Sequence, residues 1–423
     1  MPNSDTSSTS RIHAIDALRG FALLGILVVN IQSFSMINAA FHNPAAYGDL
    51  GGWNYWVWFY TYSLVDSKFL ALFSMLFGVS MLLIHQRYES VGFDNVVTYQ
   101  KRRFAILIVI GLLHAYLIWP GDILVTYGLC GLLLLPAVQM RLSPRILIIS
   151  GVFLLSIPSL NMLGSVVSPD LLDAGEKAQI SEQWSPSPNS YQDELAAYRG
   201  HWLAQQSQRA QETLSVHIQN LPLTLVWRVG GLMLIGMALF KLGIVSAVRS
   251  LRFYRCMTLV GIGIGAPLMF YNSQQWSNTQ WSLAYYESIG FQINYWCGLL
   301  LAGGYIGLIM WLCLTGRLIW LISLLAQVGR MALSNYLLQS LLCTLIFYGH
   351  GLGLFGKLER TEQLAVVVLV WLINLIFSTI WLKYYWQGPI EFIWRRLCQG
   401  DSKRMKGVKL KESTPFKTGF RNN

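Results

Sequence analysis

Residues 101–128 of this chain read KRRFAILIVIGLLHAYLIWPGDILVTYG, and the expected class of fold follows from this stretch. Three consecutive bases precede an apolar run, Pro120 and Gly121 interrupt that run, and a second apolar run follows. A helix that crosses a bilayer needs about 20 apolar residues, and basic residues gather at its cytoplasmic end. The stretch therefore predicts two transmembrane helices that are joined by a short turn and entered from the cytoplasm.

The composition of the whole chain agrees with a membrane protein. Of its 423 residues, 54% are hydrophobic and 12% are charged, which is about half the charged share of a soluble protein. The formal net charge is +11, but the bases lie between apolar runs and in the C-terminal tail. This pattern favours the lipid bilayer as a partner and argues against nucleic acid. The six cysteines show no metal or redox spacing, so no metal site is predicted.

Apolar runs bounded by polar residues predict an all-α, polytopic transmembrane bundle of about ten spans. The runs are 14–36, 67–85, 104–119, 122–139, 145–163, 221–243, 254–271, 289–313, 331–348 and 364–384. If the N-terminus is inside, 24 of the 31 lysines and arginines fall on the cytoplasmic side, which predicts that both termini are cytoplasmic. Two segments stay open. Residues 53–66 form either an outer-interface or a re-entrant element, and residues 317–329 either a cytoplasmic surface helix or the start of a span.

The same pattern divides the chain into five parts. They are a polar leader (1–10), a first membrane half with the candidate active-site helices (11–163), an extracytoplasmic loop (164–220), a second membrane half (221–394) and a basic cytoplasmic tail (395–423). The loop is long enough for a lid or for a docking surface, and its length does not distinguish the two.

A first polar cluster opens the first span, whose sequence is RIHAIDALRGFALLGILVVN over residues 11–30. Asp16 and Arg19 are three residues apart and therefore share one face of a helix. Gly20 and Asn30 continue the polar and small stripe, so this face is expected to contact protein rather than lipid. A structural ion pair is one interpretation. The nearby Arg11 favours the other, a functional site.

A second polar cluster lies in the stretch quoted first. His114 follows Arg103 by eleven residues on the same face, about 16 Å deeper, which places it near the midplane of the bilayer. Its ordinary pKa near neutrality suits a general base, and an acid would orient it. Asp122, just beyond the helix break, and Asp16 are the candidate partners. The alternatives are a structural histidine and a helix cap at Asp122.

These motifs resemble the YeiB-like family of bacterial inner-membrane proteins (domain of unknown function 418) from about residue 11 to residue 396. The motifs are RIHAIDALRGFALLGILVVNI, FLALFSMLFG, RR-x7-G-x2-H-x4-W-x-GDIL-x2-YG, GRMALSNYL-x-QS and GP-x-E-x3-R. The resemblance implies the bacterial inner (plasma) membrane.

The D-x-x-RG opening also resembles, more distantly, the transmembrane acyltransferases of the heparan-α-glucosaminide N-acetyltransferase and acyltransferase-3 type. Those proteins pass an acyl group from cytosolic acyl-CoA to a sugar across the membrane. Asp16, Arg19 and Gly20 match the shared motif. The lumenal His and Asn of the sugar acetyltransferases, beside a Trp, have a loose counterpart in His42, Trp53 and Asn54, at a different spacing.

The leading hypothesis is an acyl-CoA-dependent (acetyl-CoA) membrane acyltransferase with an envelope acceptor. It assigns catalysis to His114, Asp122 and Asp16. It assigns the donor phosphates to Arg11, Lys101, Arg102, Arg103 and Arg330, and the substrate to Arg19, Asn30, Arg228, His42 and Asn54. The alternatives are a transporter or channel for a small anionic solute, suggested by Arg228, which lacks a local acid, and a non-catalytic scaffold. A homo-oligomer is compatible with each.

Overall fold

The computed structural model describes residues 4–93, 95–167 and 173–399, and every regular element in these ranges is helical. The first part of the chain forms α1 (Ser4–Ser35), α2 (Asn38–His42), α3 (Trp53–Tyr60), the π-helical η1 (Thr61–Val65), α4 (Lys68–Ser90), α5 (Val96–Leu117), α6 (Leu124–Gln139) and α7 (Pro144–Val167). The middle forms α8 (Ala174–Trp184), α9 (Pro188–Arg199), α10 (Gln205–Ser215), η3 (Val216–Leu225) and α11 (Val226–Lys241). The last part forms α12 (Leu251–Asn278), α13 (Leu283–Tyr285), η4 (Tyr286–Gly290), α14 (Phe291–Thr315), α15 (Ile319–Arg330), α16 (Ala332–Phe347), α17 (Arg360–Tyr384) and α18 (Pro389–Gln399).

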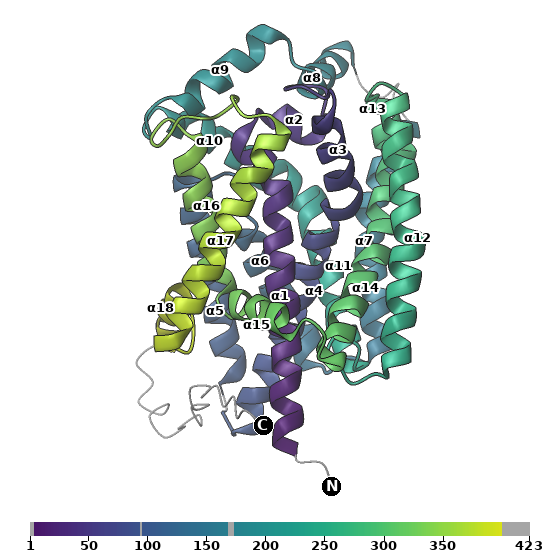
Figure 1. Cartoon of the computed structure of the whole chain (residues 1–423), viewed down its shortest axis with the longest axis vertical. Helices are drawn as coiled ribbons and strands as arrows, with labels where there is room; N and C mark the ends of the chain where they lie inside the picture. Colours follow the sequence, from purple (N-terminus) through teal and green to yellow (C-terminus); the bar gives the residue numbers. More distant parts are fainter. Residues whose placement is uncertain (1–3, 94, 168–172, 400–423) are drawn as a thin grey trace.

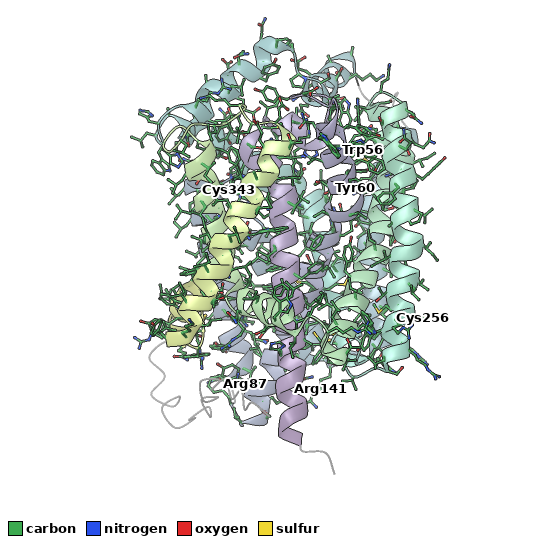
Figure 2. The ribbon with its side chains drawn as sticks, in the orientation of Figure 1. Trp56, Tyr60, Arg87, Arg141, Cys256 and Cys343 are labelled. Atoms are coloured by element: carbon green, nitrogen blue, oxygen red, sulfur yellow. The ribbon has the colours of Figure 1, made fainter. Side chains whose placement is uncertain are left out.

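The long helices run along the long axis of the molecule, and α1 passes among them (Figure 1). Helices α12 and α14 lie side by side, whereas α8, α9 and α10 cover the end opposite the N-terminus. We call these two ends the N-terminal end and the loop end. Figure 2 places Arg87 and Arg141 near the N-terminal end, and Trp56 and Tyr60 towards the loop end.

Among the described residues, seven helices are long and apolar enough to cross a membrane, or up to eight if α15 and α16 form one bent span. All ten predicted runs are helical, but the count of ten spans is not confirmed. The predicted run 104–119 belongs to α5, which carries three bases at 101–103 and continues only to Leu117, so the apolar part of the helix is short. The run 122–139 belongs to α6, whose 16 residues extend about 24 Å, less than the apolar thickness of a bilayer.

The two segments that the sequence left open are parts of larger helical units. Residues 53–66 form α3 and η1, which combine with α4 into a single candidate span, Trp53–Ser90. Residues 317–329 include most of α15, which meets α16 at an angle of 84°. In its described part, the loop predicted for 164–220 contains α8, α9 and α10, and a continuous helix, Gln205–Lys241, runs through its expected end.

Helix α15 packs across α1 at a point where the two backbones touch. A Cβ atom on Gly20 would lie 1.9 Å from the carbonyl oxygen of Leu325, and one on Gly329 would lie 1.9 Å from the carbonyl oxygen of Asp16. Helices in membranes approach this closely only where small residues face each other. The polar stripe predicted for the first span therefore does face protein, and its partner is α15.

This crossing predicts a strong effect of one methyl group. We expect Gly20→Ala to lower the free energy of unfolding by about 1–3 kcal/mol, because the added Cβ forces α1 and α15 apart. Gly263→Ala in α12 is the matched control, since a Cβ at that position meets nothing within 4 Å. Thermal unfolding of the two variants in the same detergent compares them, and an equal change in both would contradict the prediction.

The loop end carries a carboxylate with an unusual pKa. Glu194 of α9 accepts a hydrogen bond of 2.8 Å from the backbone N–H of Asn38. Burial, and then repulsion from Glu212, raise the pKa of Glu194 to about 8. The folded state therefore binds a proton that the unfolded state releases near pH 4.5. The stability that this group contributes therefore falls as the pH rises from 4.5 to about 8, and it is constant above pH 8.

We expect the contact between α9 and α2 to be weaker at pH 9 than at pH 6, because deprotonation leaves a charged carboxylate in a partly buried position. Hydrogen exchange over residues 188–199, corrected for the intrinsic effect of pH, measures this difference. Glu194→Gln should remove it. A difference that persists in that variant would assign the pH dependence to another group.

Candidate functional site

His114 and Asp122 form a buried pair. The imidazole Nδ1 of His114 lies 2.8 Å from Oδ1 of Asp122, and the two side chains are 1% and 0% exposed. The second carboxylate oxygen of Asp122 accepts a hydrogen bond of 2.9 Å from the backbone N–H of Val125, in the first turn of α6. Asp122 thus closes the start of α6 and holds His114 at the same time. Both contacts that the sequence suggested for this residue, with His114 and with the start of the next helix, are present.

The chain between the two residues is shaped for this contact. Pro120 cannot continue α5, so the chain turns back into α6. A Cβ atom on Gly111 would lie 2.6 Å from the backbone nitrogen of Val125 and 3.0 Å from Oδ2 of Asp122. Only glycine therefore permits this approach of α5 to α6.

Hydrogen bonds from α10 and the residues just before it hold the C-terminal end of α5. The last carbonyls of a helix have no partner within it. Here Thr213 donates to the carbonyl of Ala115 at 3.1 Å, and Arg209 donates to that of Tyr116 at 3.0 Å. The indole of Trp202 donates to the carbonyl of Leu117 at 3.0 Å. These bonds fix the turn of α5 that carries His114.

The other ring nitrogen of His114, Nε2, is buried and has no hydrogen-bond partner among the described residues. The Tyr336 ring lies 5.2 Å from the imidazole, centroid to centroid, and the Trp119 ring lies 6.2 Å away. The Tyr336 hydroxyl and the Trp119 indole N–H are likewise buried and unpaired within the described chain. A histidine with Nδ1 held by a carboxylate and Nε2 free has the arrangement of a general base.

Asp16 does not contact His114. Its carboxylate lies 2.8 Å from Nη1 of Arg19, whose Nη2 donates to the Ser80 hydroxyl at 3.0 Å. The sequence left Asp122 and Asp16 as alternative partners of the histidine, and the structure gives Asp122 that contact. Asp16 instead belongs to a charged group at the N-terminal end.

Two arginines lie close to Asp16, and a third lies close to one of these two. Arg19 is on α1, Arg103 is on α5 within electrostatic range of Arg19, and Arg330 ends α15 within range of Asp16. We call these three the arginine cluster. The Arg103 guanidinium stacks at 4.2 Å on the Trp394 ring of α18, and Arg330 donates to the carbonyl of Trp386 at 2.7 Å.

The other residues that the sequence assigned to the donor phosphates are not part of the arginine cluster. Lys101 and Arg102 are exposed on α5. The side chain of Arg11 lies outside the described residues. The arginine cluster therefore brings together Arg19, which the sequence assigned to the substrate, and two of the residues assigned to the donor phosphates.

The predicted substrate residues do not all converge on His114. The side-chain oxygen of Asn54 accepts hydrogen bonds from the backbone N–H and the hydroxyl of Thr361, at 3.1 and 3.0 Å, so it joins α3 to α17. Arg228 lies over the Tyr295 ring at 4.9 Å, and Asn30 is half-buried on α1. His42 is the last residue of α2, and it is exposed.

A buried lysine that the sequence did not assign to a site lies near Arg228. Lys68 is 0% exposed. Its ammonium donates to the carbonyl of Tyr62 at 2.9 Å and to the side-chain oxygen of Asn294 at 2.7 Å. The Asn294 amide in turn donates to Asp66 at 2.8 Å. Asn294, an amide in an otherwise apolar part of the run 289–313, was the available signal, but 226 residues separate it from Lys68.

These features define an all-helical integral membrane protein with a buried histidine–carboxylate pair. Residues 239–401 match the model of the family described as "Protein of unknown function (DUF418)". The chain is 34% identical to the uncharacterised protein YeiB of Escherichia coli (strain K12), over 90% of this chain and 95% of that protein. It is 28% identical to the uncharacterised protein YxaH of Bacillus subtilis (strain 168), over 92% and 94%. No solved structure matches. The chain belongs to the YeiB-like family of membrane proteins, DUF418.

The buried pair predicts graded effects at position 122. Asp122→Ala leaves both the His114 imidazole and the Val125 N–H without an acceptor, which costs about 1–3 kcal/mol for each group. Asp122→Asn keeps one acceptor oxygen and should destabilise the protein less. Unfolding in detergent measures both variants, with Asp193→Ala as the control because Asp193 is exposed on α9. Equal losses in the two alanine variants would refute a stabilising role of the pair.

Proposed function

We propose that this protein is a membrane acyltransferase that moves an acyl group from cytosolic acyl-CoA to a hydroxyl group of an envelope acceptor. The observation that carries the proposal is the His114–Asp122 pair, with Nδ1 held at 2.8 Å and Nε2 buried and unpaired among the described residues. A structural histidine that is this deeply buried would be expected to use both of its nitrogens.

The chemistry assigned to the pair is general base and then general acid catalysis. His114 Nε2 takes the proton of the acceptor hydroxyl as its oxygen attacks the thioester carbonyl. A C–O bond forms and the C–S bond breaks. The imidazolium returns the proton to the departing CoA sulfur. Asp122 keeps the Nδ1–H oriented and stabilises the imidazolium, which is the role of a carboxylate in such pairs.

The arginine cluster supports a donor site at the N-terminal end. Arg19, Arg103 and Arg330 carry three positive charges, and Asp16 is the acid among them. Arginine is suited to phosphate groups because it offers several N–H donors in one plane. CoA phosphates bound here would place the donor on the side that the basic residues identify as cytoplasmic, in the bacterial inner membrane with both termini inside.

Transport of a small anionic solute is the second candidate. The observation that favours it is the 84° bend between α15 and α16, directly beside the Asp16–Arg19 pair, because transporters place charged residues at broken helices. Thermal unfolding with and without acetyl-CoA distinguishes the two, since stabilisation by acetyl-CoA is expected of the enzyme alone.

The enzyme proposal predicts the result of one substitution. His114→Ala should reduce acyl transfer by about a hundredfold or more, which is the usual contribution of a general base. Transfer of labelled acetyl groups from acetyl-CoA into the glycan and lipid fractions of membrane vesicles that contain the purified protein is the measurement. His201→Ala is the control, because the His201 ring is exposed on the α9–α10 connection. Transfer that is unchanged in the His114 variant would rule the assignment out.

A further inference from the structure

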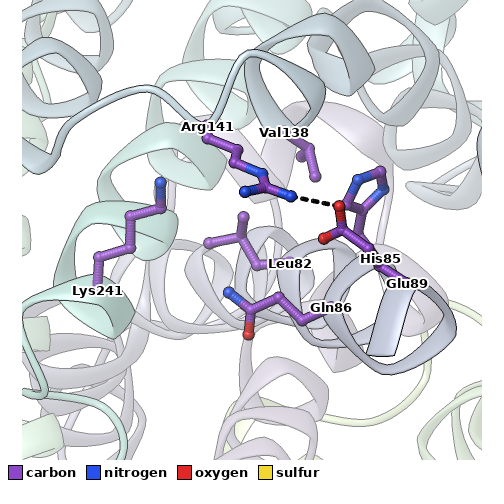
Figure 3. A pocket seen from close by; sticks show the side chains of 7 residues that line it. All are labelled: Leu82, His85, Gln86, Glu89, Val138, Arg141 and Lys241. Carbon is purple, nitrogen blue, oxygen red and sulfur yellow. Dashed lines mark hydrogen bonds and ion pairs between the residues drawn. The ribbon is translucent and has the colours of Figure 1, made fainter. Parts of the chain in front are cut away.

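A polar cavity of about 250 Å³ lies where α4, α6 and α11 end, and it is lined by residues other than those assigned above (Figure 3). Leu82 of α4 and Val138 of α6 form its apolar wall. All the other lining side chains are polar or charged, and each of the three helix ends contributes at least one of them. A cavity of this size accommodates a small polar group rather than a single water molecule.

The lining carries an excess of positive charge. Arg141 forms an ion pair with Glu89, which Figure 3 shows across the cavity. The Lys241 ammonium donates to the backbone carbonyl of Leu142 at 2.6 Å, and no carboxylate pairs with it among the described residues. Two of its three N–H groups stay available to a ligand. An anion at this position would neutralise the remaining charge.

Two further observations point to a ligand. Nδ1 of His85 is buried without a hydrogen-bond partner in the described chain, and His85 is one of the lining residues. Arg141 has a φ of 49°, in the left-handed region that side chains other than glycine rarely adopt. Its pairing with Glu89 and the bond from Lys241 to the adjacent Leu142 hold this strained turn in place. Strained residues of this kind concentrate at binding sites.

The surroundings indicate where the anion comes from. Met140 is 70% exposed, and α7, which begins just after the turn, exposes 48% of Ile146 and 69% of Ile149. Apolar side chains that are exposed at the end of membrane-spanning helices contact lipid, and basic pockets at this depth bind anionic headgroups. We propose that this cavity binds the phosphate group of an anionic lipid whose acyl chains lie against these residues.

The test is binding of dioctanoyl phosphatidylglycerol to the full chain in neutral detergent, with dioctanoyl phosphatidylcholine as the uncharged comparison. Lys241→Gln and Arg141→Gln should each weaken binding roughly fivefold, which is the usual effect of one base at a membrane surface. Glu89→Gln should strengthen binding, because it frees Arg141. The opposite sign of this change separates loss of the site from loss of the fold.

Arg87→Gln is the matched control. It removes an exposed base from the same helix end without altering the lining. Equal weakening by Arg87→Gln and Lys241→Gln would overturn the proposal, because a diffuse surface charge would then explain the binding. Glycerol 3-phosphate that binds as tightly as the lipid would overturn the lipid source. Equal binding of the two short-chain lipids would exclude recognition of the anion.

Discussion

The end of α5 and the starts of α6 and α16 are packed against other parts of the protein, and the polar backbone groups there must find partners inside it. The apolar part of a bilayer offers none, and each unsatisfied group costs several kcal/mol. Side chains from distant segments meet this requirement. Arg209 and Thr213 cover the end of α5, and Asp122 closes the start of α6. Glu391 of α18 accepts a hydrogen bond of 2.8 Å from the backbone N–H of Leu333 at the start of α16.

The candidate catalytic pair is a consequence of the same requirement. Asp122 is needed at the start of α6, and its second oxygen is therefore in a fixed position when it meets His114. Helix α1 runs from the arginine cluster towards this pair. Asp16 lies near one end of the apolar part of α1 (His13–Ser35), and Phe34, which stacks on Trp119 at 4.1 Å, lies near the other. These two residues of α1 are about 27 Å apart, so the charged groups are distributed through the depth of the bundle.

Most helices could be predicted from the sequence, whereas their number as spans could not. Apolar runs locate helices, but α6 and the part of α5 that follows its three bases are apolar over less than a membrane thickness. The contact between His114 and Asp122 was predictable because eight residues separate them across a visible break. The hydrogen bonds that link Lys68, Asn294 and Asp66 could not be predicted. They join segments more than 200 residues apart, which only the packing of α4 against α14 brings together.

The stacking of Arg103 on Trp394 has a consequence for biosynthesis. The indole of Trp394 also donates to the carbonyl of Arg103 at 3.0 Å, although 291 residues separate the two in the chain. These two contacts of α5 therefore form only after α18, the last described helix, has been synthesised. Until then the guanidinium of Arg103 lacks the Trp394 ring, and the start of α16 lacks Glu391. The contacts of Arg103 and of the start of α16 therefore require nearly the whole chain to have been synthesised, and α18 supplies the last of them.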